Sequence, residues 1–260
     1  MTGIEPVYGQ GVEVRAASKQ FLSRAGRQTA LSAVDLTIGP GQFVSLLGPS
    51  GCGKTSLLRI IGGLLEPTTG TVSIDGRSVD DAVRARKFGF VFQDATLLPW
   101  RTVRANAMLL LDVIGRRNEE ARVDALLETV GLSNFANHYP AQLSGGMRQR
   151  VALARALALD PEILLMDEPF AALDAITRER LGVELLGIWD GARAVVFVTH
   201  SISEAVLLSD RVVVMSTSPG RVVADIPIDL PRPRNGAVRL SEPFKTYEDQ
   251  LRGLIEGVRA

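Results

Sequence analysis

The sequence predicts an α/β fold in which helices cover a parallel sheet and a helical insert interrupts it. Three continuous apolar runs, at residues 163–166, 194–198 and 212–215, suit parallel strands that are buried on both faces. A glycine-rich loop separates another apolar run from a helical segment. Residues 103–139 have helical spacing and no strand-like run, so the insert is placed at about residues 95–150.

The other elements are predicted from alternation, turn residues and composition. Residues 12–16 alternate like an edge strand, Gly39-Pro40-Gly41 forms a turn, and residues 71–79 form a hairpin around Asp75-Gly76. Beyond about Pro231 the sequence becomes polar and contains prolines. The remaining elements are strands at 31–38, 43–47 and 88–92, and helices at 56–65 and 244–258.

Composition and charge narrow the class of protein. Lys plus Arg and Asp plus Glu each number 29, so the net charge is zero and bulk attraction to a nucleic acid is not indicated. The single cysteine, Cys52, excludes an internal disulfide and is consistent with a reducing compartment. Residues 1–11 do not resemble a secretory signal, and no apolar stretch approaches the roughly 18 residues that span a bilayer. Work at a membrane would therefore require another protein to hold the chain there.

Residues 48–55 match the phosphate-loop pattern G-x-x-x-x-G-K-[ST]. Glycines let backbone N–H groups point at phosphate oxygens, and the following helix presents its N-terminus to the same anion. We expect Lys54 to reach the β- and γ-phosphates and the Thr55 hydroxyl to ligate Mg²⁺. A strand before the loop and a helix after it argue against a chance glycine-rich turn. Cys52 is interpreted as a small filler of this loop, the alternative being a redox switch.

Four polar residues follow apolar runs of the predicted sheet: Gln93, Asp167, Glu168 and His200. Ligands of open α/β sheets bind at the carboxyl ends of the strands. We expect Asp167 to hold the Mg²⁺ shell and Glu168 to polarise the attacking water. His200 is a candidate contact for the γ-phosphate and Gln93 for the metal or water, although a lone His after a strand is usually structural. The catalytic candidates are Lys54, Gln93, Glu168 and His200, and the metal candidates are Thr55, Gln93 and Asp167.

The segment Leu143-Ser144-Gly145-Gly146-Met147-Arg148-Gln149-Arg150 resembles the signature of ABC ATPases. Physically it is a second phosphate-binding helix start with bare N–H groups at residues 144–146, the alternative being an ordinary Ser N-cap. The resemblance covers about residues 12–235. It implies a P-loop NTPase (RecA-like) core with an antiparallel β subdomain and an inserted helical subdomain. An ATP-binding domain at 1–235 would then be followed by a tail at 236–260 that packs on it.

The resemblance further implies that two copies pair head to tail, so that the signature of one copy closes on ATP bound to Lys54 of the other. Asp174 matches the loop that links the two sites. Phe21 matches the aromatic residue that stacks on adenine, the alternative being a core residue. The nucleotide-binding residues implied are Phe21, Gly48, Pro49, Ser50, Gly51, Cys52, Gly53, Lys54, Thr55, Ser56, Ser144, Gly145, Gly146 and Asp174.

Several segments look like the importer ATPases for nitrate, sulfonates and taurine: Leu97-Leu98-Pro99-Trp100, residues 166–174 and Ser218-Pro219-Gly220-Arg221. That resemblance implies a peripheral subunit on the cytoplasmic face of the cell membrane, bound to a permease and indirectly to a solute-binding protein. Residues 98–100 would face the permease, unless Trp100 is core of the insert. Met147 and Ser201 depart from the family's usual Gln and Asp.

Three other functions are weighed against this one. An ABC ATPase acting on nucleic acid or the ribosome usually carries coiled coils, zinc motifs or a duplicated cassette, which this sequence lacks. A small-molecule P-loop kinase is disfavoured by the signature segment. An ABC motor for lipid traffic is disfavoured by residues 98–100 but stays open. The sequence predicts an ATP-hydrolysing, Mg²⁺-dependent transporter subunit without a nucleic-acid partner, and it does not name the solute.

Overall fold

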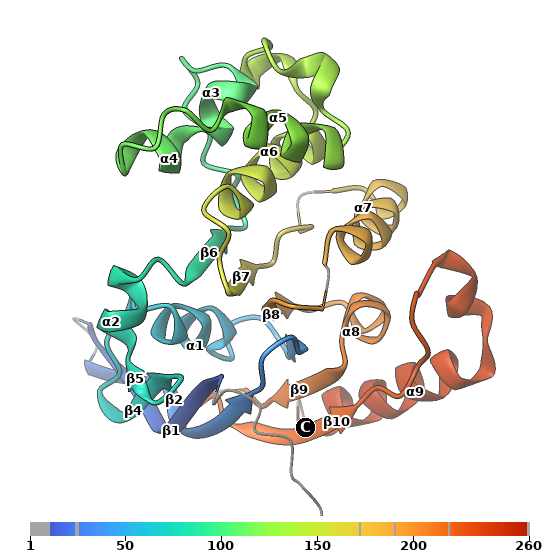
Figure 1. The fold of residues 1–260 in the computed structure, drawn as a ribbon. Coiled ribbons are helices and arrows are strands. Elements are labelled where there is room, and N and C mark those ends of the chain that lie inside the picture. The colour runs from blue at the N-terminus through green and yellow to red at the C-terminus, as the bar shows by residue number, and fades with distance from the viewer. Residues whose placement is uncertain (1–10, 24–25, 172, 190, 218, 259–260) are drawn as a thin grey trace, which may run out of the picture.

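The computed structural model describes residues 11–23, 26–171, 173–189, 191–217 and 219–258 of the chain. Within these residues it contains a six-stranded sheet, a four-stranded sheet and a group of inserted helices. In Figure 1 the inserted helices, in green to yellow-green, lie at the opposite end of the molecule from the four-stranded sheet, in blue to teal. Ala172 and Ser218, which belong to two importer-like segments, lie outside the described residues, as do residues 1–10 of the segment judged not to be a secretory signal.

The six-stranded sheet has the order β10-β9-β3-β8-β7-β6. All neighbours pair in parallel except β10, which is antiparallel to β9. Every residue of β3, β7 and β8 is buried, as the apolar runs predict. The bounds of the strands are β3 (Phe43–Leu47), β6 (Phe88–Val91), β7 (Ile163–Asp167), β8 (Ala194–Thr199), β9 (Arg211–Met215) and β10 (Val222–Pro227).

Helices cover both faces of this sheet. Alternate residues of β3 enter two different apolar cores: Phe43 and Leu47 enter one, and Val44 and Leu46 enter the other. The first core also contains side chains of α7, α8 and α9, and the second contains those of α1 and the four-stranded sheet. The bounds are α1 (Lys54–Ile61), α7 (Ala175–Ile188), α8 (Ile202–Leu208) and α9 (Glu242–Gly257).

The helix predicted at residues 56–65 is shorter and begins earlier than expected. Gly53 takes the left-handed conformation (φ 92°), so the phosphate loop ends there and α1 begins directly at Lys54. At the other end, α1 stops before Gly62, and Gly63 is again left-handed (φ 71°). The apolar pattern continues to Leu65, but these glycines end the helix first.

The four-stranded sheet contains β1 (Val12–Ser23), β2 (Gly26–Ile38), β4 (Thr69–Ile74) and β5 (Arg77–Ser78) in the order β2-β1-β4-β5. The prediction of an edge strand at 12–16 is wrong, because β1 is longer and lies between β2 and β4. Register shifts follow Val14, and Ala16 has a φ of 45°, so a bulge breaks the alternation while the pairing continues. The hairpin is confirmed: Asp75 and Gly76 join β4 to β5 with positive φ, and α2 (Val79–Arg84) follows.

The region predicted to be helical forms a separate apolar cluster. Side chains from all of its main helices meet there, among them Val103, Leu111, Leu127 and Val151. The helical content of residues 103–139 is therefore confirmed. The elements are α3 (Val103–Ala107), α4 (Leu109–Val113), α5 (Glu120–Thr129), short 3₁₀ turns at Ser133–Phe135 and Pro140–Gln142, and α6 (Gly145–Leu157).

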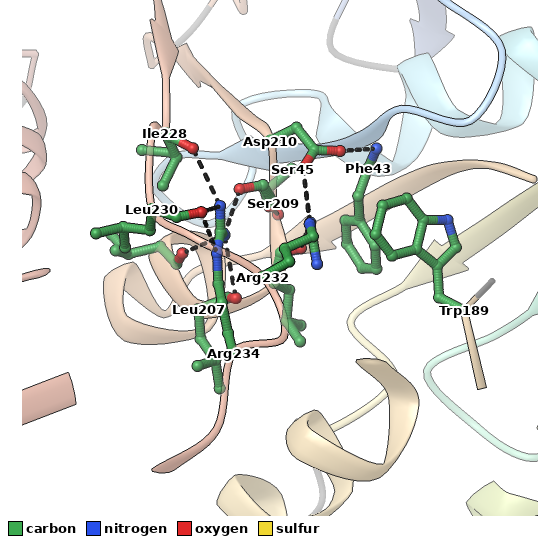
Figure 2. Close-up of polar contacts among 12 residues, drawn as sticks. Phe43, Ser45, Trp189, Leu207, Ser209, Asp210, Ile228, Leu230, Arg232 and Arg234 are labelled. Atoms are coloured by element: carbon green, nitrogen blue, oxygen red, sulfur yellow. Dashed lines mark hydrogen bonds and ion pairs between the residues drawn. The ribbon is translucent and has the colours of Figure 1, made fainter. Parts of the chain in front are cut away.

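Beyond β10 the chain returns across the end of α8. Arg234 is 4% exposed and its guanidinium lies among backbone oxygens rather than carboxylates (Figure 2). Burial lowers its pKa to about 10, so it remains a cation at neutral pH. It donates hydrogen bonds of 2.7–3.2 Å to the carbonyl oxygens of Val206, Leu207, Ser209, Ile228 and Leu230.

A second arginine fastens the same segment to the sheet. Arg232 donates a hydrogen bond to Asp210 (2.7 Å), whose other carboxylate oxygen accepts from the Phe43 N–H (2.9 Å). The Arg232 guanidinium also lies 4.2 Å from the centre of the Trp189 ring. The two arginines together join the C-terminal segment to α8, β3 and the end of α7.

The helix predicted at 244–258 corresponds to α9. It begins at Glu242 because the Ser241 hydroxyl accepts from the Phe244 N–H. Phe244 and Leu251 are buried in the core that α7 and α8 share. The division into a domain at 1–235 and a tail at 236–260 stays a prediction. Among the described residues, no helix is long and apolar enough to cross a membrane.

Replacing Arg234 with Met should lower the free energy of unfolding by about 3 kcal/mol, because several buried carbonyl groups would lose their donor. Urea unfolding of the full-length chain measures the effect. Lys245→Met is the matched control, since Lys245 is an exposed cation on α9 that forms an ion pair with Glu242 of its own helix. Equal destabilisation by the two substitutions would contradict the role of Arg234.

Candidate functional site

The phosphate loop wraps around the side chain of Lys54. Lys54 is 4% exposed, and its Nζ donates to the carbonyl oxygens of Gly48 (2.7 Å) and Pro49 (2.9 Å). The Cys52 Sγ lies 3.7 Å from the same nitrogen and is buried. A cation is thus held inside a loop whose backbone can offer N–H groups to an anion. The burial of Cys52 favours its interpretation as a filler, because redox-active thiols are accessible.

Close backbone packing at Gly220 supports the phosphate loop. Gly220 donates its N–H to the Ala30 carbonyl (3.0 Å), and its own carbonyl accepts from the Ser32 N–H (2.9 Å). A Cβ on Gly220 would lie 1.9 Å from the Cys52 carbonyl oxygen, so only glycine fits. Sequence reasoning placed Gly220 in an importer-like segment without assigning it this contact with the phosphate loop.

The candidate metal site, which we call the metal edge, lies at the carboxyl ends of β3 and β7. The Thr55 hydroxyl donates to Asp167 Oδ1 at 2.7 Å. Burial raises the pKa of Asp167, and this hydrogen bond opposes the rise. Gln93 lines the same cleft of about 530 Å³ as Thr55 and Asp167. Hydroxyl, carboxylate and amide oxygens are ligands that suit Mg²⁺.

The few oxygen ligands at this site suit a metal ion that also binds a phosphate of its substrate. No cluster of three or more His, Cys, Asp or Glu side chains that could hold a metal occurs in the described part of the chain. Mg²⁺ is usually bound by one or two carboxylates together with water and the phosphates of a substrate. Asp167, with Thr55 beside it, fits that mode of binding.

Glu168 and His200 form a pair beside this edge. Their carboxylate Oε2 and imidazole Nδ1 atoms are 3.3 Å apart, and the imidazole is half exposed. Glu168 has a φ of 43°, and its N–H donates to the Val198 carbonyl of β8 at 3.0 Å. Residues held in this sparsely populated conformation are frequent at functional sites. The arrangement gives a carboxylate that can accept a proton from water and an imidazole that can contact an anion.

Two buried side chains of α6 hold the segment that carries Gln93. Gln149 is 7% exposed and donates to the carbonyl oxygens of Phe92 (2.8 Å) and Gln93 (3.4 Å). Arg155 donates to the Ala95 carbonyl at 2.7 Å. Sequence reasoning named Gln149 only as part of the signature segment and did not name Arg155. It predicted neither contact, because the partners are backbone groups more than fifty positions away.

A third buried contact supports His200. The Thr199 hydroxyl donates to Glu204 Oε2 at 2.6 Å, and Arg178 of α7 lies 3.5 Å from the other carboxylate oxygen. Burial raises the pKa of Glu204. The end of β8 is therefore fastened to α8 and α7 next to His200. In the sequence, Glu204 is an acid near the start of a helical segment, and that pattern does not predict this contact.

The signature residues and Asp174 do not join the phosphate loop within this copy of the chain. Ser144 caps α6 by accepting from the Met147 N–H (3.3 Å), and Asp174 caps α7 by accepting from the Thr177 N–H (2.9 Å). In the described ranges, no hydrogen bond or ion pair links residues 144–146 or Asp174 to the phosphate loop. Ser144 and Asp174 are both exposed.

Phe21 lies on β1 with 41% of its surface exposed. The alternative that it is a core residue is wrong. The Lys19 Nζ lies 5.5 Å from the centre of its ring. An exposed ring with one cation beside it is suited to stacking on a planar group. Ser56 follows Thr55 in the first turn of α1, directly after the loop.

Comparisons with a family model and with curated proteins point to the same family. A model described as "ABC transporter" matches residues 31–171, more than half of the chain. An uncharacterized ABC transporter ATP-binding protein of Methanocaldococcus jannaschii is 48% identical, with 94% of this chain and 91% of that protein covered. The taurine import ATP-binding protein TauB of Rhizobium johnstonii is 46% identical (94% and 96% covered). The nitrate import ATP-binding protein NrtD of Synechocystis is 41% identical (95% and 95%).

Solved structures agree with this result. The dimeric post-hydrolysis state of the ATP-binding cassette MJ0796, bound to ADP and Pi, superposes with a TM-score of 0.74 at 36% identity. The match covers 84% of this chain and 99% of that cassette. The α/β fold predicted from the sequence, with its parallel core, antiparallel sheet and helical insert, is thereby confirmed. The chain belongs to the ABC transporter family, as one of its ATP-binding subunits.

Proposed function

We propose that this chain hydrolyses ATP to energise the import of a small solute through a membrane permease. One observation carries the proposal: the phosphate loop around Lys54, the Thr55–Asp167 hydrogen bond and the Glu168–His200 pair meet at one edge of the sheet. Phosphate binding, metal binding and water activation are the three tasks of phosphoryl transfer to water. Each task has a candidate group at this edge.

The residues divide among these tasks. Lys54 and the backbone of residues 48–56 bind the phosphates, and Phe21 stacks on the adenine. Thr55, Asp167 and Gln93 would hold Mg²⁺, which neutralises phosphate charge when it is bound. Glu168 takes the proton of the attacking water, and His200 contacts the terminal phosphate. No observation favours a nucleic-acid, ribosomal or lipid-traffic function.

Two copies complete the site in this proposal. The exposed cap at Ser144, the glycines that follow it and Asp174 would meet ATP held by the partner. The dimeric cassette with ADP and Pi supports such pairing, since it covers most of this chain. A helix N-terminus supplies N–H groups and a favourable dipole to phosphate oxygens.

The permease would contact the helical insert. Trp100 is 71% exposed, so the alternative that it belongs to the insert core is wrong. Its loop is held by buried Asn106, which accepts from the Leu98 N–H (2.7 Å) and donates to the Arg101 carbonyl (3.0 Å). An apolar cleft of about 520 Å³ opens between core and insert, lined in part by Leu64, Val83, Phe88, Phe90 and Leu110.

Relatives support a proposal for the solute class and the location of the chain. Proteins named for nitrate and taurine import cover nearly all of this chain. We therefore favour a small anion or sulfonate as solute, delivered to the permease by a solute-binding protein. The chain would act on the cytoplasmic face of the membrane, with residues 1–235 as the ATP-binding domain and 236–260 as a segment packed on it.

Glu168→Gln should lower kcat for ATP hydrolysis by at least about 100-fold, because water activation loses its proton acceptor. ATP binding should persist and yield a stable ATP-dependent dimer, detectable by size-exclusion chromatography. Glu162→Gln is the control, since Glu162 is an exposed acid just before the other end of β7. Hydrolysis by Glu168→Gln at the wild-type rate would contradict the proposal that Glu168 activates the attacking water.

Pull-down of tagged Glu168→Gln, held in ATP and Mg²⁺, from gently solubilised membranes should recover a multi-span permease. Adding Trp100→Ala should reduce that recovery about tenfold, because an exposed aromatic is a frequent interface anchor. Leu240→Ala is the matched control, since Leu240 is 79% exposed in the C-terminal segment. Recovery of ribosomes or nucleic acid without a permease would contradict transport, and unchanged recovery with Trp100→Ala would contradict the permease contact.

Gln149→Met should lower kcat about fivefold while ADP affinity stays unchanged. The substitution removes the hydrogen bonds that fix the backbone of residues 92–93, and one such bond contributes about 1 kcal/mol. ATPase kinetics and ADP titration measure the two quantities. Gln142→Met is a control within the insert, and equal losses in both variants would assign Gln149 to stability alone.

A further inference from the structure

A second cleft adjoins the phosphate loop. The metal edge described above, with Thr55, Gln93 and Asp167, lines one cleft. The other, which we call the histidine-side cleft, has a volume of about 310 Å³ and is lined by Pro49, Ser50, His200, Arg252, Ile255 and Glu256 among others. The last three residues belong to α9. The C-terminal helix thus forms one wall of a cavity whose other wall is the phosphate loop.

Arg252 is placed in this wall by buried anchors on the same helix. The preceding residue, Leu251, is fully buried, and Phe244 is 1% exposed. The Tyr247 hydroxyl accepts from the Asp229 N–H at 3.0 Å. At the end of α9 the Val258 carbonyl accepts from the Thr217 hydroxyl at 3.2 Å. Figure 1 shows α9 running toward the C-terminus near β9 and β10.

The charge on Arg252 is available to a ligand. Its side chain is exposed, and in the part of the chain described by the structure no carboxylate lies within ion-pair distance of its guanidinium. Glu256, one helical turn further, lines the same cleft and likewise has no ion-pair partner among those residues. Opposite them stand a half-exposed imidazole, His200, and the first residues of the phosphate loop. A guanidinium and an imidazole facing one cleft favour a phosphate group, whose oxygens accept several hydrogen bonds.

We propose that Arg252 of the C-terminal helix contacts, across the histidine-side cleft, the phosphate group that faces His200. The proposal rests on the proposed ATPase function of the same site and deepens it. The phosphate is either the terminal group of ATP or inorganic phosphate after its release. ADP lacks the γ-phosphate and is therefore bound without Arg252.

The test uses the full-length chain and compares nucleotides with and without a γ-phosphate. Arg252→Ala should weaken binding of the non-hydrolysable analogue AMP-PNP, or weaken inhibition of hydrolysis by inorganic phosphate with ADP present, by about fivefold. ADP affinity should not change. Arg252→Lys should restore most of the loss, and Glu256→Gln should tighten AMP-PNP about twofold by removing a like charge. Lys245→Ala, which removes a cation from α9 away from this cleft, is the matched control.

The outcomes separate the possibilities. An effect on AMP-PNP assigns the bound group to ATP, an effect on inorganic phosphate alone assigns it to the product, and either supports the proposal. Equal weakening of AMP-PNP and ADP, or no change in any ligand, would overturn it. A loss confined to dimer formation, with ligand affinity intact at low protein concentration, would also overturn it and assign Arg252 to a contact with the second copy.

Lys54→Ala distinguishes this proposal from the function on which it rests. If Lys54→Ala leaves nucleotide binding and hydrolysis unchanged, the assignment of the phosphate loop is wrong. If Lys54→Ala removes them while Arg252→Ala leaves the ratio of AMP-PNP to ADP affinity and phosphate inhibition unchanged, only the role of Arg252 is wrong.

Discussion

Parallel pairing of five strands is the constraint on which the rest of this structure depends. Because β6, β7, β8, β3 and β9 run in the same direction, the residues that follow them emerge at one edge of the sheet. Gln93 and His200 follow β6 and β8, Asp167 is the last residue of β7, and all three lie near the phosphate loop. The chemistry of the site is therefore a consequence of strand direction, because β6, β7 and β8 each place a polar residue at or just beyond their carboxyl ends.

Irregular segments around this edge are fixed by buried donors that reach backbone carbonyls. Gln149 and Arg155 hold residues 92–96, and Arg234 holds the segment that leads to α9. Buried carbonyl groups need hydrogen-bond donors, and an irregular loop has no regular backbone pairing that would supply them. A single side chain from a neighbouring element meets this need and sets the position of the loop. Hydrogen bonds from buried side chains to backbone carbonyls thus support the site on the insert side and on the C-terminal side.

Most of the fold was predictable from local patterns, and the errors have physical causes. The buried parallel strands were found because burial on both faces leaves continuous apolar runs. The edge strand at 12–16 was wrong because a bulge at Ala16 interrupts the alternation inside β1. Strand β10 was missed, since only one of its faces is half-buried and its pairing is antiparallel at an edge. Helix α1 was displaced because Gly53 and Gly62, rather than the apolar pattern, determine its ends.

The sequence by itself determined the chemistry: a loop able to surround a phosphate, an acid pair after a buried strand, and a signature segment that caps a helix. These features are local, because each depends on residue types at fixed short spacings. Only the tertiary structure decided that Gln149 holds Gln93, that Gly220 underlies Cys52, and that Arg252 lines the cleft beside His200. Such contacts join residues far apart in the chain, and their positions depend on how whole elements pack, which no short pattern encodes.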